Sequence, residues 1–101
     1  MSAGGVSITF EMQVKPDLLS PFLEGLPGLV RESSQFPGFR SMRVVQHKDD
    51  PTRLLLIECW ESQDAYDRYI AWRTERGDME RLADVVLSTK VEVWPTLITQ
   101  V

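Results

Sequence analysis

Cysteine and histidine are nearly absent from the chain, with one residue of each among 101. A single cysteine excludes an internal disulfide, and Cys59, which lies in an apolar run, is expected to be a small buried residue. One histidine and one cysteine are too few for a zinc site, and no glycine-rich phosphate-binding loop is visible. We therefore expect no metal and no other cofactor.

Basic charge and long apolar segments are also scarce. Eleven Lys and Arg residues stand against fifteen Asp and Glu residues, which gives a formal net charge of −4. Such a chain repels phosphates, which argues against nucleic acid and anionic membranes as partners. Residues 1–5 lack the basic and apolar regions of a signal peptide, and no stretch is long enough to cross a bilayer. We expect a cytoplasmic protein.

The first two elements follow from hydrophobic periodicity. Apolar and polar residues alternate over residues 6–14, which predicts a strand with one apolar face. Apolar residues recur at helical spacing over residues 19–30, although prolines and glycines interrupt them. Pro21 suits the first turn of this helix, whereas Pro27 cannot donate to the Leu23 carbonyl, so we expect a bend there.

Two extended runs surround a turn in the middle of the chain. Pro37-Gly38 ends the first helical region, and Asp50-Pro51 is typical of a turn between two strands. These strands are expected at residues 39–47 and 53–60, as a hairpin. The second strand contains the continuous apolar run 54–57, which indicates a strand covered on both faces.

Two helices are expected after the hairpin. Ser62 caps the first one, which carries Tyr66, Tyr69 and Arg73 on its inner stripe and Trp72 at its far end. Apolar residues at helical spacing over residues 79–86 then predict a second, short helix.

A last strand is expected at residues 91–99. Its Pro95 cannot donate to a ladder and so belongs on an edge or at a bulge, and Trp94 beside it is expected to make an edge or dimer contact. The order β-α-β-β-α-α-β is that of a ferredoxin-like, split β-α-β fold of the α+β class, an antiparallel sheet with helices on one face.

The other face of the sheet predicts self-association. The central strand carries apolar residues on both sides, Leu54, Leu56 and Trp60 on one and Leu55, Ile57 and Cys59 on the other. About half of the apolar surface of this strand would remain exposed to water in a monomer. At about 25 cal/mol per Å², burying a few hundred Å² drives association by several kcal/mol. We expect a homodimer packed through its sheet faces.

The motifs together resemble a known family. The stretch Phe36-Pro37-Gly38-Phe39, the turn at residues 49–53 and Trp60-Glu61-Ser62, in this order and spacing, are similar to the antibiotic biosynthesis monooxygenase family of dimeric α+β barrels. The resemblance covers nearly the whole chain and implies one such domain over residues 1–101. The family contains cofactor-free oxygenases of phenolic polycycles, quinol monooxygenases, haem-degrading enzymes and members without known activity.

The resemblance also implies site residues. In the oxygenase members a Trp that closes the third strand and a Tyr six residues later line the cavity, and Trp60 and Tyr66 match that spacing. These members carry an Asn four residues before the Trp and an Arg on the following helical segment. Here Leu56 replaces the Asn, and only a displaced Arg76 or Arg81 could supply the Arg.

Further candidates complete the expected site. Phe10, Leu56, Tyr69 and Trp72 are expected to contact a small aromatic substrate, although aromatic clusters also suit the core of a small domain. His47 is the only side chain whose ordinary pKa lies near neutrality, so it is the default general base, at what looks like an exposed turn.

Two more positions bear on the chemistry. Glu58 interrupts an apolar strand, so its carboxylate needs a partner or has a raised pKa, and an ion pair with Arg43 is favoured over a role as base. Haem-degrading members hold iron through a His on the later helical segment and use an Asn in the first strand. This chain has no His after His47 and has Thr9 in the strand, so such haem binding is not expected.

Two functions therefore stay open. The first is a cofactor-independent monooxygenase acting with O₂ on a quinol or polycyclic phenol. Loss of the substrate's proton gives an electron-rich anion that can pass an electron directly to O₂, so a dry apolar pocket with a few polar groups suffices. The second is a non-catalytic dimeric barrel that binds a small apolar ligand or has an accessory role. Oxygen uptake separates them.

Overall fold

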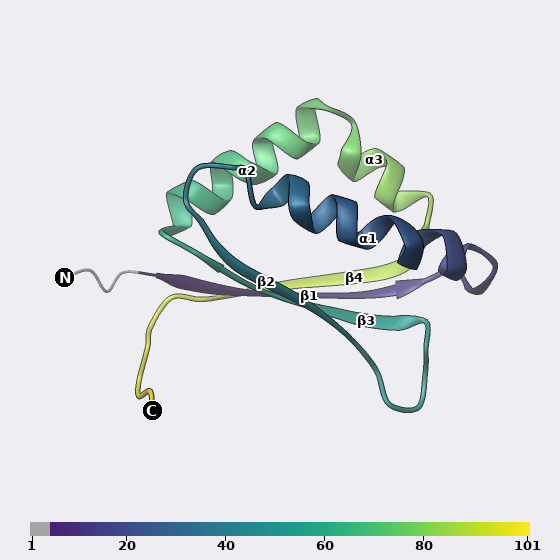
Figure 1. Cartoon of the computed structure of the whole chain (residues 1–101), viewed down its shortest axis with the longest axis horizontal. Helices are drawn as coiled ribbons and strands as arrows, with labels where there is room; N and C mark the ends of the chain where they lie inside the picture. The colour runs from purple at the N-terminus through teal and green to yellow at the C-terminus, as the bar shows by residue number, and fades with distance from the viewer. Residues whose placement is uncertain (1–4) are drawn as a thin grey trace.

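The computed structural model describes residues 5–101, so most of the segment examined for a signal peptide lies outside the described residues. The strands, β1 (Val6–Val14), β2 (Phe39–Gln46), β3 (Arg53–Trp60) and β4 (Val86–Trp94), form an antiparallel sheet in the order β2-β3-β1-β4. The helices α1 (Leu19–Ser33), α2 (Gln63–Glu75) and α3 (Asp78–Ala83) lie on one face of it (Figure 1), and the short 3₁₀ turn η1 (Pro16–Leu18) precedes α1. The expected ferredoxin-like α+β fold is confirmed. None of the described helices is long and apolar enough to span a membrane.

Strand β1 forms the centre of the core. It pairs with β3 on one side and β4 on the other, and its alternation places every second side chain under the helices. These side chains are all buried: Val6, Ile8, Phe10, Met12 and Val14. The strand predicted at residues 6–14 is therefore confirmed in its position and in its inward face.

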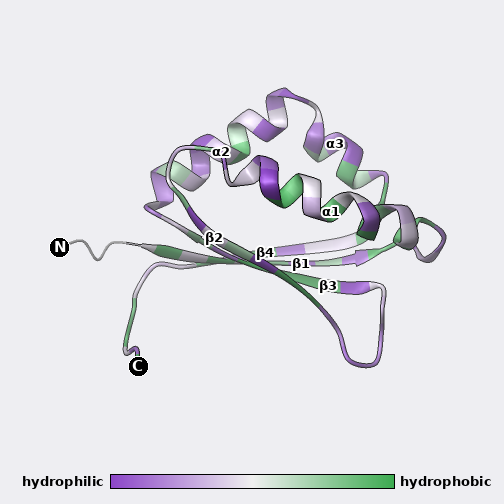
Figure 2. Ribbon diagram, in the orientation of Figure 1, coloured by the Kyte–Doolittle hydropathy of each residue, from purple (hydrophilic) through white to green (hydrophobic). Residues whose placement is uncertain are grey.

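Strand β3 has two different faces. Leu54, Leu56, Glu58 and Trp60 are buried under the helices, whereas Leu55, Ile57 and Cys59 are half-buried on the helix-free face. Figure 2 shows hydrophobic residues along much of this strand. The expectation that Cys59 is buried is wrong for this chain, because its position in the alternation turns it away from the helix-covered core.

The turn between β2 and β3 is closed by Asp50. Its carboxylate accepts hydrogen bonds from the backbone N–H and the hydroxyl of Thr52, at 3.0 and 2.7 Å, and its carbonyl accepts from the Arg53 N–H at 3.0 Å. The predicted hairpin is confirmed, with β2 ending at Gln46.

A glycine allows the start of β2 to pack closely against the start of α2. Gly38 has a φ of +92°, and a Cβ added there would lie 2.5 Å from the Cβ of Ala65. Its carbonyl accepts from the Glu61 N–H at 2.7 Å. The hydroxyl of Ser62 accepts from the Ala65 N–H at 3.1 Å, so the predicted helix cap is confirmed.

The predictions for three prolines have different outcomes. Pro21 lies in the first turn of α1 as expected, and the helix continues past Pro27 to its end at Ser33. The last strand, predicted at residues 91–99, is β4 and ends at Trp94, so Pro95 lies beyond it. The Lys15 N–H donates to the Val85 carbonyl at 2.9 Å. This long-range contact fixes the start of β4 beside the end of β1 and overrides the local helical spacing.

Candidate functional site

A cavity of about 80 Å³ lies between the sheet and the three helices. Its wall is mostly apolar: Phe10, Met12, Phe22, Leu26, Leu29, Met42, Leu56, Ile70, Met79 and Leu82. Four further residues bring polar groups to it: Glu58, Tyr69, Arg73 and Asp78. An apolar cavity with a small number of polar groups is typical of a site for a small organic ligand.

Glu58 is the carboxylate that β3 contributes to this cavity. Glu58 is only 3% exposed, and its Oε1 accepts a hydrogen bond from Trp60 Nε1 at 3.0 Å. Burial raises the pKa of Glu58, while the Trp60 hydrogen bond and the charge of Arg73 act in the opposite direction. The carboxyl group therefore holds its proton more tightly than an exposed glutamate does.

The predicted ion pair between Glu58 and Arg43 is wrong. Arg43 lies opposite Ile57 in the sheet, and Met42 is the residue opposite Glu58. Neighbouring residues on a strand point to opposite faces, so Arg43 is exposed on the helix-free side, away from the cavity.

Arg73 connects the three helices at the edge of the cavity. The residue is 5% exposed, and each of its N–H groups has an acceptor. Nε donates to the Tyr69 hydroxyl at 3.0 Å, and the other donors reach Glu32 at 2.6 Å, Asp78 at 2.9 Å, Ser33 Oγ at 2.9 Å and the Leu29 carbonyl at 3.2 Å. A guanidinium has five N–H donors, so none is left for a ligand.

The same contacts determine the ionisation of the cluster. Burial alone would lower the pKa of Arg73, but the hydrogen bonds to Asp78, Tyr69 and Glu32 outweigh it and raise that pKa. The hydrogen bonds from Arg73 and Arg76 lower the pKa of Glu32. This cluster is therefore fully charged near neutral pH, and its main effect is to hold α1, α2 and α3 together.

Tyr69 presents its ring, and not its hydroxyl, to the cavity. The hydroxyl lies 2.7 Å from Ser33 Oγ, which itself donates to the Leu29 carbonyl at 3.0 Å. Since Ser33 has one hydroxyl proton, Tyr69 donates to Ser33 and accepts from Arg73. The ring centroid lies 4.5 Å from that of Trp60, in a tilted arrangement.

The structure brings part of the predicted site together. Phe10, Leu56 and Tyr69 line the cavity, and Trp60 lies behind it, fully buried, with its indole N–H used on Glu58. Tyr66 is buried beside a separate outer hollow of about 360 Å³. The cavity and this outer hollow share three wall residues: Phe10, Ile70 and Met79.

Trp72 lies outside the cavity wall. Its ring packs against Phe36, with centroids 5.3 Å apart, and the guanidinium of Arg76 lies over it at 4.5 Å. Arg76 also pairs with Glu32 at 2.9 Å, and Arg81 pairs with Asp78. Neither arginine lines the cavity. The arginine in the wall is Arg73, which the sequence placed only on the inner stripe of its helix.

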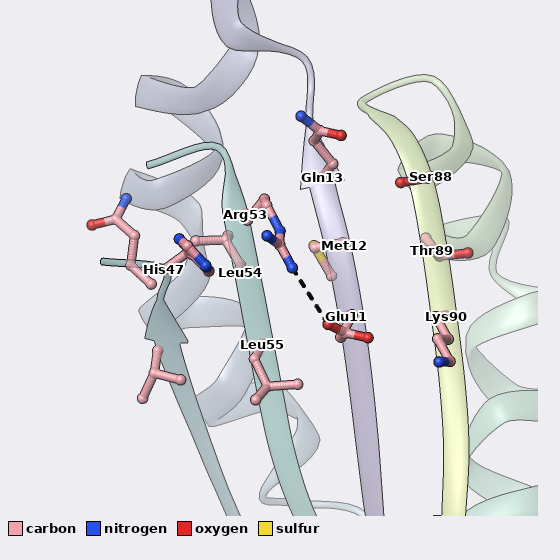
Figure 3. Close-up of a pocket in the computed structure, with 12 residues that line it drawn as sticks. Glu11, Met12, Gln13, His47, Arg53, Leu54, Leu55, Ser88, Thr89 and Lys90 are labelled. Atoms are coloured by element: carbon pink, nitrogen blue, oxygen red, sulfur yellow. Dashed lines mark ion pairs between the residues drawn. The ribbon is translucent and has the colours of Figure 1, made fainter. Parts of the chain in front are cut away.

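His47 lies on the other side of the sheet. It lines a groove of about 480 Å³ on the helix-free face, together with Leu55, Arg53 and Glu11 (Figure 3). The Arg53 guanidinium lies 3.9 Å from the Glu11 carboxylate, and His47 Nδ1 accepts from the Asp49 N–H at 3.0 Å. The sheet thus separates His47 from the cavity that Tyr69 and Leu56 line.

The described residues form no cluster of metal-ligating side chains. Over residues 5–101, no three or more His, Cys, Asp or Glu side chains are arranged to hold a metal ion.

The fold is that of a ferredoxin-like α+β protein with a cavity between its sheet and its helices. The family model for antibiotic biosynthesis monooxygenases matches residues 5–76. The chain therefore belongs to the antibiotic biosynthesis monooxygenase family, a family of the monooxygenase type. A search among curated proteins finds no match.

Solved structures with the same fold cover almost the whole chain. SnoaB, a cofactor-independent oxygenase from Streptomyces nogalater, is 16% identical with a TM-score of 0.82, over 96% of this chain and 97% of SnoaB. A conserved protein from Methanosarcina mazei Go1 is 19% identical with a TM-score of 0.82, over 93% and 94% of the two chains. Rv0793 from Mycobacterium tuberculosis is 19% identical with a TM-score of 0.81, over 94% and 97%. At these identities the likeness shows the fold.

Proposed function

We propose that this protein is a cofactor-independent monooxygenase that oxidises a quinol or a phenol with O₂. The observation that carries the proposal is the cavity between sheet and helices, whose apolar wall contains a buried carboxylate, Glu58. Membership of the monooxygenase family and the fold shared with the oxygenase SnoaB support it.

The reaction needs only a substrate anion and O₂. The ionised phenol gives one electron to O₂, and the resulting radical and superoxide combine in a new C–O bond. The O–O bond of this peroxide then breaks, so that one oxygen stays on the ring carbon as a carbonyl and the other leaves as water. The product has two hydrogens fewer and one oxygen more than the substrate, so the equation balances without another reductant.

The wall residues have separate tasks in this proposal. Phe10, Leu56 and the ring of Tyr69 contact the aromatic substrate and exclude water, which strengthens every electrostatic interaction inside. Trp60 holds the carboxylate of Glu58 in place. Tyr66 lines the outer hollow, and in this proposal the substrate enters that hollow before it reaches the cavity. His47 would take part only in a reaction on the helix-free face.

We also propose that the protein acts as a homodimer through its sheet faces. The helix-free face carries the half-buried Leu55, Ile57 and Cys59, together with the exposed Val45 and Trp94. Covering these residues removes apolar area from water, which favours association. Location in the cytoplasm stays a prediction from composition.

Oxygen uptake tests the function. The purified protein, freed of metal by a chelator, is mixed with a series of quinols, naphthols and anthrone-like phenols, and O₂ consumption is followed with an electrode. We expect uptake above the rate of autoxidation and one molecule of water and of quinone per O₂. If no substrate in the series is consumed faster than in buffer, a barrel that binds a small apolar ligand without catalysis becomes the better description.

A further inference from the structure

We infer that Glu58 is the acid–base group of the cavity: it accepts the proton of the substrate hydroxyl and returns it to the oxygen that leaves as water. The inference rests on the proposed function and assigns a catalytic residue that the family resemblance did not supply. It replaces His47, which the sheet separates from the cavity.

The first argument is the hydrogen-bonding capacity of the cavity wall. The hydroxyl of Tyr69 is hydrogen-bonded to Ser33 and Arg73, and all five N–H donors of Arg73 have acceptors within the protein. Asp78 is paired with Arg73 and with two further arginines. A carboxylate has about four acceptor sites, and among the described residues Glu58 receives one hydrogen bond, from Trp60. Glu58 is therefore the carboxylate of the wall with the most acceptor sites left for a substrate hydroxyl, since Asp78 already accepts from Arg73 and Arg81 and lies beside Arg76.

The second argument is the position of Glu58 on the sheet. Its neighbours on the same face of β3 are Leu56 and Trp60, and Ile8 of β1 and Met42 of β2 lie opposite it. These side chains are apolar apart from the indole N–H, so the substrate hydroxyl has no competing acceptor on the floor of the cavity. A ring that packs on Leu56 and Tyr69 presents its hydroxyl to this carboxylate.

The third argument is electrostatic. The charged and titratable groups that face Glu58 are Arg73, Tyr66 and Tyr69 from α2 and Asp78 from α3. Proton transfer from a phenol to Glu58 moves the negative charge from the carboxylate to the substrate and leaves the net charge of the cavity unchanged. Because burial raises the pKa of Glu58, the carboxylate is a stronger base than an exposed glutamate.

The steps balance in protons. Glu58 takes the hydroxyl proton, and the substrate anion reduces O₂ and binds it as a peroxide on a ring carbon that still carries hydrogen. Glu58 then protonates the peroxide, takes the proton from that carbon as the O–O bond breaks, and gives it to the departing hydroxide. The carboxylate is restored, one oxygen remains as a carbonyl, and one molecule of water is released.

The test separates proton transfer from oxygenation. 4-Nitrophenol serves as a probe because its neutral and ionised forms differ in colour and its ring carbon opposite the hydroxyl is blocked. Its absorption is recorded with the wild type and with Glu58→Gln, Glu58→Asp and Glu75→Gln, over a range of pH. Glu75 is the matched control, since it is exposed at the end of α2.

We expect part of the bound probe to be ionised by the wild type and by Glu75→Gln at a pH where the free probe is neutral. With Glu58→Gln the bound probe should stay neutral, and Glu58→Asp should give a smaller ionised fraction. Oxygen uptake on a substrate of the wild type should fall about a hundredfold in Glu58→Gln, the range of a lost general base. Circular dichroism establishes that each variant is folded.

The outcomes are distinct. Ionisation of the probe by Glu58→Gln at the wild-type level, or an absorption spectrum that the wild type leaves unchanged, overturns the assignment of Glu58. Oxygen uptake that persists at the full rate in Glu58→Gln also overturns it, while the monooxygenase function stands. Ionisation that depends on Glu58 without oxygen uptake on any phenol supports the acid–base role and overturns the monooxygenase function.

Discussion

The indole Nε1 of Trp60 lies 3.0 Å from Oε1 of Glu58, and the two residues are 0% and 3% exposed. They are two positions apart on β3, so they share one face of the sheet and the strand itself brings donor and acceptor together. A buried carboxylate thus obtains a neutral partner from its own strand.

Trp60→Phe should remove the hydrogen bond between the indole and Glu58. The variant removes the indole donor and part of the ring volume, so we expect a loss of about 2 to 4 kcal/mol in the free energy of unfolding, measured by urea denaturation. Because the indole hydrogen bond lowers the pKa of Glu58, that pKa should rise further, and the acid limb of oxygen uptake should move to higher pH. Glu75→Gln, at an exposed residue on the end of α2, is the control and should change stability by less than about 1 kcal/mol. An unshifted acid limb would contradict the role of Trp60.

Glu58→Gln should gain stability relative to the wild type as pH rises. The pKa of Glu58 is raised in the folded protein, so the folded state binds this proton more tightly than the unfolded chain, whose glutamate pKa is about 4.3. The favourable contribution of the protonated group is complete below that value and is lost as pH rises through the folded-state pKa. Unfolding free energies measured from about pH 4 to about pH 8 should show a growing difference in favour of the variant. A difference that does not vary with pH would show that the pKa of Glu58 is not raised in the folded protein.

Arg73→Lys should weaken the contacts that hold α1, α2 and α3 together. Lysine keeps the charge but cannot reproduce the five donors of the guanidinium, so Glu32, Asp78 and Ser33 lose partners. We expect a loss of about 2 to 4 kcal/mol in the free energy of unfolding, close to the cost of breaking a buried pair. Arg68→Lys, on the exposed side of α2, should leave stability unchanged. Equal stabilities of the two variants would refute the structural role of Arg73.

Gly38→Ala and Gly25→Ala should have opposite effects. Gly38 has a φ of +92° and no room for a Cβ beside Ala65, so alanine there should cost about 2 to 3 kcal/mol in the free energy of unfolding. Gly25 lies inside α1 with nothing within 4 Å of an added Cβ, so alanine there should gain about 0.5 to 1 kcal/mol. Thermal unfolding of both variants under the same conditions provides the comparison.

Leu55→Glu should disrupt assembly. The side chain is half-buried on the helix-free face, where a second sheet would cover it, and a charge there would be desolvated in a dimer. Light scattering at micromolar concentration should give a dimer for the wild type and a monomer or unfolded chain for the variant. Lys48→Glu, at the exposed end of the β2–β3 hairpin, should remain dimeric. A wild type that scatters as an 11.6 kDa monomer would refute the proposed assembly.

Most of the fold could be predicted because its signals are local. Alternation located β1, the Asp50-Pro51 pair located the hairpin, and Ser62 located the start of α2. The last strand was misplaced because its start depends on the bond from Lys15 to Val85, two residues far apart in the sequence. Local helical spacing gives no information about such a contact.

The candidate site was less predictable, because a one-residue difference in strand register changes the face of a side chain. Arg43 was paired with Glu58 from the hairpin pattern, whereas the sheet places it opposite Ile57. The role of Arg73 was missed because its partners Glu32 and Ser33 lie at the end of α1, some 40 positions earlier in the chain. The inner-stripe position of a charged residue was the available signal.

The volume of the cavity has a kinetic consequence. At about 80 Å³ it is smaller than the roughly 150 Å³ that holds one benzene molecule, so under the proposed function the cavity must widen to admit a phenol, and movement of Phe10, Ile70 or Met79, which it shares with the outer hollow, would widen it. Ligand affinity is then reduced by the small fraction of molecules that are open. Association should be slow and strongly temperature-dependent for large rings, and with good substrates the opening rate, and not electron transfer to O₂, would limit turnover.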